Sequence, residues 1–145
     1  DMGGIIMKFD KWFNSLALLA AIGLLLAPIF FPICPVEMGK PPMRCFYVYR
    51  AELLFAGLAV IGAVALFRVK TREARKVLGI GILLLALIIF ALPFSGVLGI
   101  CGHAASPCHI TAIFSCGVSI LLALSGAVIA WHEPAQAGEQ EQTTE

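Results

Sequence analysis

"ITAIFSCGVSILLALSGAVIAW", residues 110–131, contains no charged side chain. A hydrocarbon layer about 30 Å thick is crossed by about 20 helical residues, so this stretch is long enough to span a membrane. Lipid offers no hydrogen bonds to backbone N–H and C=O groups, and within one segment only a helix satisfies them all. The stretch therefore predicts a transmembrane α-helix.

Three more apolar runs precede it, and together the predicted spans cover residues 12–33, 46–67, 77–100 and 110–131. The chain is 60% hydrophobic and 13% charged, with a mean hydropathy of +0.95, and a soluble domain of 145 residues could not bury that much apolar surface. We therefore expect an all-α fold, an integral membrane four-helix bundle of two transmembrane hairpins in a single domain over residues 1–131. Residues 132–145 are expected to form a disordered acidic cytoplasmic tail.

The basic residues predict how the spans are oriented. Lys8 and Lys11 precede the first span, and five more basic residues lie in "RVKTREARK" (68–76), between the second and third spans. The opposite side carries three: Lys40, Arg44 and Arg50. Because cytoplasmic loops carry an excess of Lys and Arg, both termini are expected in the cytoplasm of a plasma (inner) membrane, and the cysteine-bearing loops outside it. The net charge of +1 gives no indication of nucleic-acid binding.

Four of the five cysteines fall in or beside the two outer loops: Cys34, Cys45, Cys101 and Cys108. Outside the cytoplasm, an even set of cysteines in short loops favours disulfides, which would pin an extracytoplasmic cap. Pairing within each loop is favoured, because the two cysteines of each pair are close in sequence, and pairing between the loops stays open. Cys116 lies inside the fourth span and is expected to be a small buried residue.

Small residues recur four apart along the fourth span. Such a face lets helix backbones approach closely, so these positions are candidates for helix packing or for docking a larger membrane protein or a second copy: Ala112, Cys116, Ser119, Ala123, Gly126 and Ala127. The bulky stretch "ILLLALIIF" (82–90) of the third span is expected to face lipid or a partner.

Three polar side chains stand near the outer end of the second span: Arg44, Arg50 and Glu52. We expect them at the interface rather than mid-membrane, with Arg50 extending to the headgroups. In an alternative arrangement Glu52 pairs with Arg44 or Lys40. No ionisable side chain is expected deep within a span, where such groups usually mark a transport pathway.

The loops carry a family resemblance in Cys34, in "MRCFYVYRAE" (43–52) and in "GICG" (99–102) with "PCHIT" (107–111). These motifs and their distance from the spans resemble the domain-of-unknown-function 4418 family, small four-helix membrane proteins of bacteria and archaea, over roughly residues 8–131. The resemblance implies no established activity. Members of that family often accompany ABC-type exporters, which implies a non-enzymatic accessory or structural subunit.

Soft ligands in the same loops offer a different interpretation. Sulfur and imidazole ligands suit copper or zinc, and seven residues could supply them: Cys34, Met38, Met43, Cys45, His103, Cys108 and His109. Thiol–disulfide chemistry is a related alternative, but its usual C-x-x-C pair is missing from the sequence. Disulfides would consume the thiolates that a metal needs, so we predict no cofactor and keep a metal-binding or redox protein as the alternative function.

Overall fold

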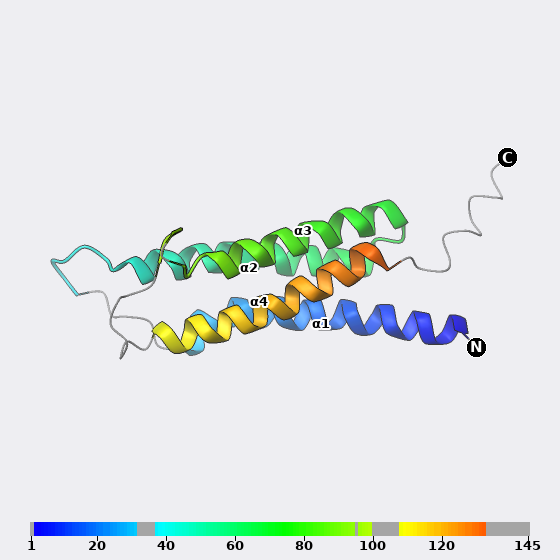
Figure 1. The fold of residues 1–145 in the computed structure, drawn as a ribbon, viewed down its shortest axis with the longest axis horizontal. Helices are drawn as coiled ribbons and strands as arrows, with labels where there is room; N and C mark the ends of the chain where they lie inside the picture. Colours follow the sequence, from blue (N-terminus) through cyan, green and yellow to red (C-terminus); the bar gives the residue numbers. More distant parts are fainter. Residues whose placement is uncertain (1, 32–36, 95, 100–107, 133–145) are drawn as a thin grey trace.

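The computed structural model describes residues 2–31, 37–94, 96–99 and 108–132, and four α-helices run through these residues (Figure 1). The helices are α1 Met2–Phe30, α2 Arg44–Arg68, α3 Arg72–Ala91 and α4 Cys108–Trp131. All four are long and apolar enough to cross a membrane. The prediction of an all-α chain with four transmembrane helices is confirmed at this level, and the chain is a multi-pass membrane protein.

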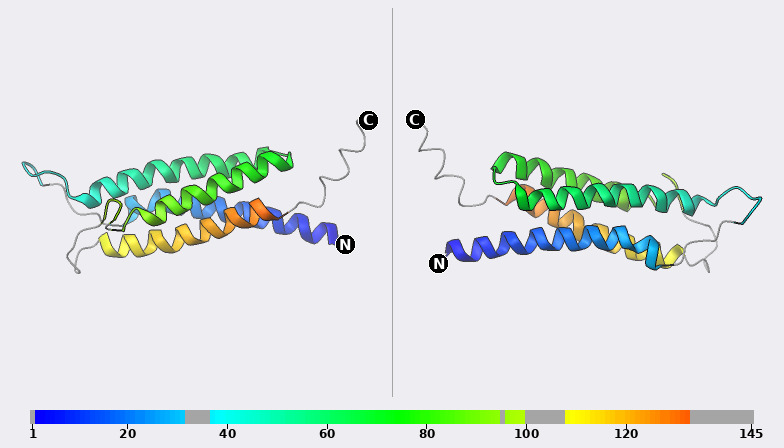
Figure 2. Two further views of the ribbon diagram at one scale, coloured as in Figure 1. Left: turned by 45° about the horizontal axis from the view of Figure 1, so that its top comes forward. Right: turned by 180° about the vertical axis from the view of Figure 1, so that it is seen from behind.

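The helices run up and down in one elongated bundle (Figures 1 and 2). Helix α1 packs against α2 and α4, and α3 packs against the same two helices, so α2 and α4 face each other across the bundle diagonal. Both α2 and α4 begin at one end, which holds Cys45 and Cys108 and is called the cysteine end. The charged end is the opposite one, where α1 begins, α4 ends and residues 69–71 connect α2 to α3.

Helix α3 is shorter than the predicted span 77–100 at one end and longer at the other. It begins at Arg72, within the basic segment, and ends at Ala91. Pro93 explains the early end, because proline has no N–H to donate to a carbonyl of the preceding turn. The chain then turns, with Val97 N donating to the carbonyl of Phe94 at 3.0 Å, and Gly99 adopts a φ of 75° that favours glycine.

Alanines dominate the buried core between the helices. Helix α1 contributes Ala17 and Ala21, and α2 contributes Ala56, Ala59 and Ala63. The bulky stretch 82–90 is divided: three of its residues are buried in this core, namely Ile82, Ala86 and Ile89. The expectation that the whole stretch faces lipid or a partner is therefore wrong, since a helix of 3.6 residues per turn presents every third or fourth residue to its neighbours.

Helices α3 and α4 come into close contact at two glycines. A Cβ added to Gly79 would lie 2.9 Å from the backbone nitrogen of Ala130, and one added to Gly126 would lie 2.9 Å from the backbone nitrogen of Leu83. Backbone therefore faces backbone here, and neither position has room for a side chain. Gly126, a candidate for docking a partner, is buried inside this contact.

We predict that Gly126→Ala destabilises the bundle, because its methyl group forces α3 and α4 apart, and overpacking of this kind costs about 1–3 kcal/mol. Gly117→Ala is the matched control on the same helix, since a Cβ there meets nothing within 4 Å. Removing a helical glycine stabilises by about 0.5–1 kcal/mol, so the control is expected to be neutral or more stable. Reversible unfolding in mixed micelles measures both, and equal stabilities would contradict the close contact.

Candidate functional site

Two hydrogen bonds cross the bundle diagonal near the cysteine end, and both join α2 to α4. The first is made by Tyr49, whose hydroxyl donates to the carbonyl oxygen of Cys108 at 2.8 Å. Tyr49, Cys45 and Cys108 form a small buried cluster separate from the main core. The first turn of α4 is thereby bonded to the second turn of α2, although the two helices are not neighbours.

Glu52 makes the second bond, and its position corrects the sequence analysis. Its side chain is 2% exposed, and the Ser115 hydroxyl donates to its Oε1 at 2.6 Å. We expected Glu52 at the interface, but its side chain lies inside the bundle. The alternative arrangement, a pair with Arg44 or Lys40, is also not found, and Lys40 instead bonds Glu37 at 2.6 Å. An ionisable side chain therefore does lie inside a span, a placement that is costly in lipid and usually functional.

The position of Glu52 on its helix accounts for its burial. Cys45, Glu52, Ala56 and Ala59 are all buried. They are spaced by three, four or seven residues, the repeat of one helix face. The aliphatic part of that face packs into the core and carries Glu52 inward with it. The burial of Glu52 was predictable from the sequence, because Glu52 is in register with Ala56 and Ala59. The nearby charged Arg50 instead suggested that both side chains lie at the interface.

Thr111 lies between the two cross-bundle bonds on the buried face of α4. It is three residues after Cys108 and four before Ser115, and its side chain is 0% exposed. Within the described residues its Oγ1 has no hydrogen-bond partner. The hydroxyls of the other two buried serines of α4 donate to carbonyls of their own helix. Ser119 donates to the carbonyl of Cys116 and Ser125 to that of Leu121, both at 2.8 Å. We call Tyr49, Glu52, Thr111 and Ser115 the polar cluster.

The structure places only some of the predicted cysteine and metal residues. Cys34, Cys101 and His103 lie outside the described residues. Cys45 and Cys108 are brought together in the buried cluster with Tyr49, whereas Met38 is fully exposed and Met43 and His109 are less so. No disulfide joins the cysteines that the structure describes, and these residues contain no group of three or more His, Cys, Asp or Glu able to hold a metal. A disulfide-pinned cap and a metal site both stay predictions.

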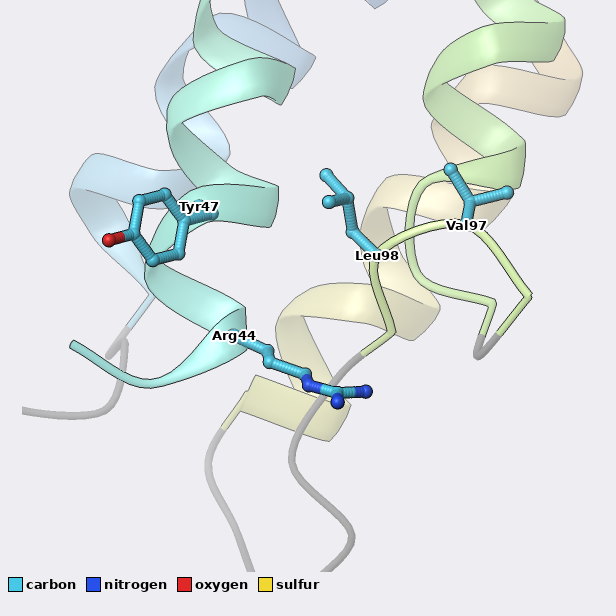
Figure 3. Close-up of a pocket in the computed structure, with 4 residues that line it drawn as sticks. All are labelled: Arg44, Tyr47, Val97 and Leu98. Carbon is cyan, nitrogen blue, oxygen red and sulfur yellow. The ribbon is translucent and has the colours of Figure 1, made fainter. Parts of the chain in front are cut away.

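The predicted arginines are exposed at the cysteine end. The guanidinium of Arg50 lies over the ring of Phe46, 5.1 Å from its centroid. Arg44 extends toward the turn after α3 and lines a half-open pocket of about 320 Å³ together with Tyr47, Val97 and Leu98 (Figure 3). An arginine beside an apolar wall suits the level where headgroups meet acyl chains.

The small residues of α4 divide between the bundle interior and an outer groove. Ala112 and Gly126 are buried inside, and Cys116 is half-buried. Ala123 and Ala127 line a wholly apolar groove of about 230 Å³ between α3 and α4, and the buried Ser119 lies beneath them in its floor. We call it the α3–α4 groove, and its lining residues are Leu83, Ala86, Leu87, Phe90, Ser119, Ile120, Ala123, Leu124 and Ala127.

A second polar group, at the charged end, escaped the sequence analysis. Asp10 Oδ1 lies 4.0 Å from a guanidinium nitrogen of Arg75 and 4.0 Å from Nδ1 of His132. The three side chains come from α1, α3 and the residue after α4, and the ring of Phe9 packs on that of His132, with centroids 5.5 Å apart. Partly exposed pairs at such distances contribute up to about 1 kcal/mol each. They help to align the helices at this end.

The fold and the polar cluster define a multi-pass α-helical membrane protein with one carboxyl held inside its bundle. A family model described as domain of unknown function (DUF4418) matches residues 16–132. The chain belongs to that family, which confirms the resemblance found in the loop motifs. No curated protein and no solved structure matches the chain.

We predict that Ser115→Ala destabilises the protein by about 1 kcal/mol, because it removes the hydroxyl that donates to the buried carboxyl of Glu52. Ser119→Ala is the matched control, since that hydroxyl bonds a carbonyl of its own helix, and its effect should be smaller. Unfolding free energies in mixed micelles compare the two. An equal loss in both variants would show that the cross-bundle bond adds nothing to stability.

Proposed function

We propose that this protein is a non-enzymatic accessory subunit that binds a transmembrane helix of a larger membrane protein in the α3–α4 groove. The observation that carries the proposal is a wholly apolar groove with small residues along α4. An ABC-type exporter is the kind of partner that the family resemblance implies.

The shape of the groove supports a helix as its occupant. Ser119, Ala123 and Ala127 follow one another at intervals of four residues, so the small-residue face runs for about 12 Å, or two helical turns. Leu87 and Phe90 stand on the α3 side. Lipid gives no hydrophobic reward for helix contact, so association depends on close packing, and a small-residue floor lets a partner backbone approach.

The groove also explains why α4 has more small residues than its packing against the other three helices requires. Gly126 already provides the close contact with α3, and Ala112 is buried. Ala123 and Ala127 remain only half-buried on the groove side. A helix with bulky side chains would fill this space better than mobile acyl chains do.

We predict that Ala123→Leu and Ala127→Leu, which fill the groove from within, abolish capture of the partner. A photo-crosslinking residue at Leu87, on the groove wall, is used in native membranes, and mass spectrometry identifies the product. Gly117→Leu is the matched control, because it adds the same bulk to α4 in open space outside the groove. The control is expected to retain the crosslink.

The proposal requires one membrane-protein partner that is lost with both groove variants and kept with the control. Melting temperatures in detergent accompany each variant, so that a folded but unbound protein is distinguished from a misfolded one. Crosslinks to lipid alone would contradict the proposal. Crosslinks between copies of this chain would replace the accessory role with a homo-oligomer.

We further propose that both termini are cytoplasmic and that the cysteine end is extracytoplasmic. Five basic residues of the segment 68–76 support this orientation. An oxidising compartment would then favour two disulfides among Cys34, Cys45, Cys101 and Cys108, with Cys116 reduced.

We predict that a membrane-impermeant maleimide labels Met38→Cys in intact cells and labels Lys70→Cys only after permeabilisation. Both positions are exposed, and they lie at opposite ends of the bundle. Wild-type protein, with its outer cysteines paired, is the control and should stay unlabelled from outside. Labelling of Lys70→Cys from outside would reverse the orientation. Wild-type labelling together with bound copper or zinc would favour the metal-binding alternative.

A further inference from the structure

Partner binding in the α3–α4 groove gives no role to the buried polar cluster. We propose that Glu52 is an intramembrane proton-binding site that exchanges its proton with the cysteine end through Thr111 and Tyr49. The inference is independent of partner binding, since Glu52 faces the bundle interior and the groove lining does not include it.

The surroundings of Glu52 make a proton the fitting ligand. Within the described part of the chain, no lysine or arginine forms an ion pair with its carboxyl, which accepts a hydrogen bond from the Ser115 hydroxyl. An isolated carboxylate in a low-dielectric interior is very costly, whereas a carboxyl that carries a proton is neutral. The oxygen-rich set of one carboxyl and hydroxyls binds a proton without the several further ligands that a metal ion needs.

Thr111 offers an acceptor for a proton bound to Glu52. The Ser115 hydroxyl donates to Oε1, so a proton on the other carboxyl oxygen requires an acceptor of its own. Thr111 Oγ1 is fully buried one turn from Ser115, and it has no partner among the described residues. A buried hydroxyl without a partner is unusual and needs an explanation. We infer that it accepts from protonated Glu52 directly or through one water molecule.

The route to the surface is one-sided. From Glu52 toward the cysteine end the facing side chains are hydroxyls, first Thr111 and then Tyr49, which bonds the first turn of α4. Toward the charged end the buried face of α2 carries Ala56 and Ala59, and the buried hydroxyls of Ser119 and Ser125 on α4 already donate to carbonyls of their own helix. The proposed exchange therefore runs toward the cysteine end, where Tyr49 is itself buried, and this suits sensing or coupling rather than conduction across the membrane.

Few other ionisable groups compete with Glu52. On α2 and α4 they are Tyr47, Tyr49 and the thiols of Cys45, Cys108 and Cys116, with His109 half-buried near the start of α4. Helix α1 has no ionisable residue after Trp12, and α3 has none after Lys76. Arg44 and Arg50 are exposed. Proton uptake near the cysteine end of the described bundle interior is therefore expected to belong to Glu52.

Infrared spectroscopy of the protein in lipid vesicles tests the proposal, because the carbonyl stretch of a protonated carboxyl is distinct from that of a carboxylate. The sequence has eight other Asp and Glu residues, so the band of Glu52 is taken from the difference between the wild-type and Glu52→Gln spectra. That difference should contain a carboxylic band at acid pH that disappears at alkaline pH. Glu52→Asp, which keeps a carboxyl if the glutamine variant fails to fold, should move the band in frequency. A band that never changes, or never appears, would overturn the proposal.

Two further variants separate a proton site from a structural brace. Thr111→Val removes the acceptor for the bound proton, so the pH at which the band is half-maximal should fall, with about a tenfold higher proton concentration needed for protonation. Ser115→Ala removes the donor to the carboxylate, so that midpoint pH should rise. Shifts in the same direction, or none, would contradict these roles. A pH jump on the charged side alone should leave the band unchanged, and a response there would overturn the one-sided route.

Discussion

The four helices associate in a solvent that gives them no hydrophobic reward, and this constraint explains most of the bundle. Lipid tails are as apolar as leucine, so helices gain only from close van der Waals packing and from polar atoms bonded inside. The core is accordingly built from alanines, and α3 meets α4 where Gly79 and Gly126 place backbone against backbone. Many other large apolar side chains, such as Leu54, Ile61 and Leu84, are exposed on the outside of the bundle, where they contact lipid.

Because of the same constraint, the hydrogen bonds of the polar cluster are important for holding the two hairpins together. Glu52 belongs to the first hairpin and Ser115 to the second, and their helices are not neighbours. Their hydrogen bond therefore fixes the spacing of both hairpins at once, which the contact of Gly79 with Gly126 cannot do because it lies within one hairpin. Tyr49 adds a parallel bond one turn nearer the cysteine end. Two polar bonds across a diagonal define one arrangement of the hairpins, where alanine packing alone would permit several.

Much of the fold follows from the sequence, because the length of an apolar run decides whether it spans a membrane. All four helices were predictable in this way, and errors arose at their ends, where Pro93 stops α3 well before the apolar composition does. Helix rotation was harder to predict. Ile82 and Ile89 resemble their lipid-facing neighbours in composition, and only packing against α4 distinguishes them. Glu52 was misplaced for a related reason, since its distance from the helix end suggested an interface, whereas its register with Ala56 determined its burial.

The position of the carboxyl within the bundle lets both of its protonation states form. Glu52 lies two turns from the start of α2, on the cysteine side of the bundle, and the Ser115 hydroxyl donates to its Oε1 at 2.6 Å. A hydrogen bond donated to a carboxylate favours the charged form, whereas burial in a low-dielectric interior favours the neutral one. Deeper in the bundle the same face of α2 carries three alanines, and the buried serines of α4 already bond carbonyls of their own helix. A carboxyl that must take up and release a proton inside a membrane needs both forms to be tolerable, and the cross-bundle bond to Ser115 supplies what the apolar core withholds from the charged form.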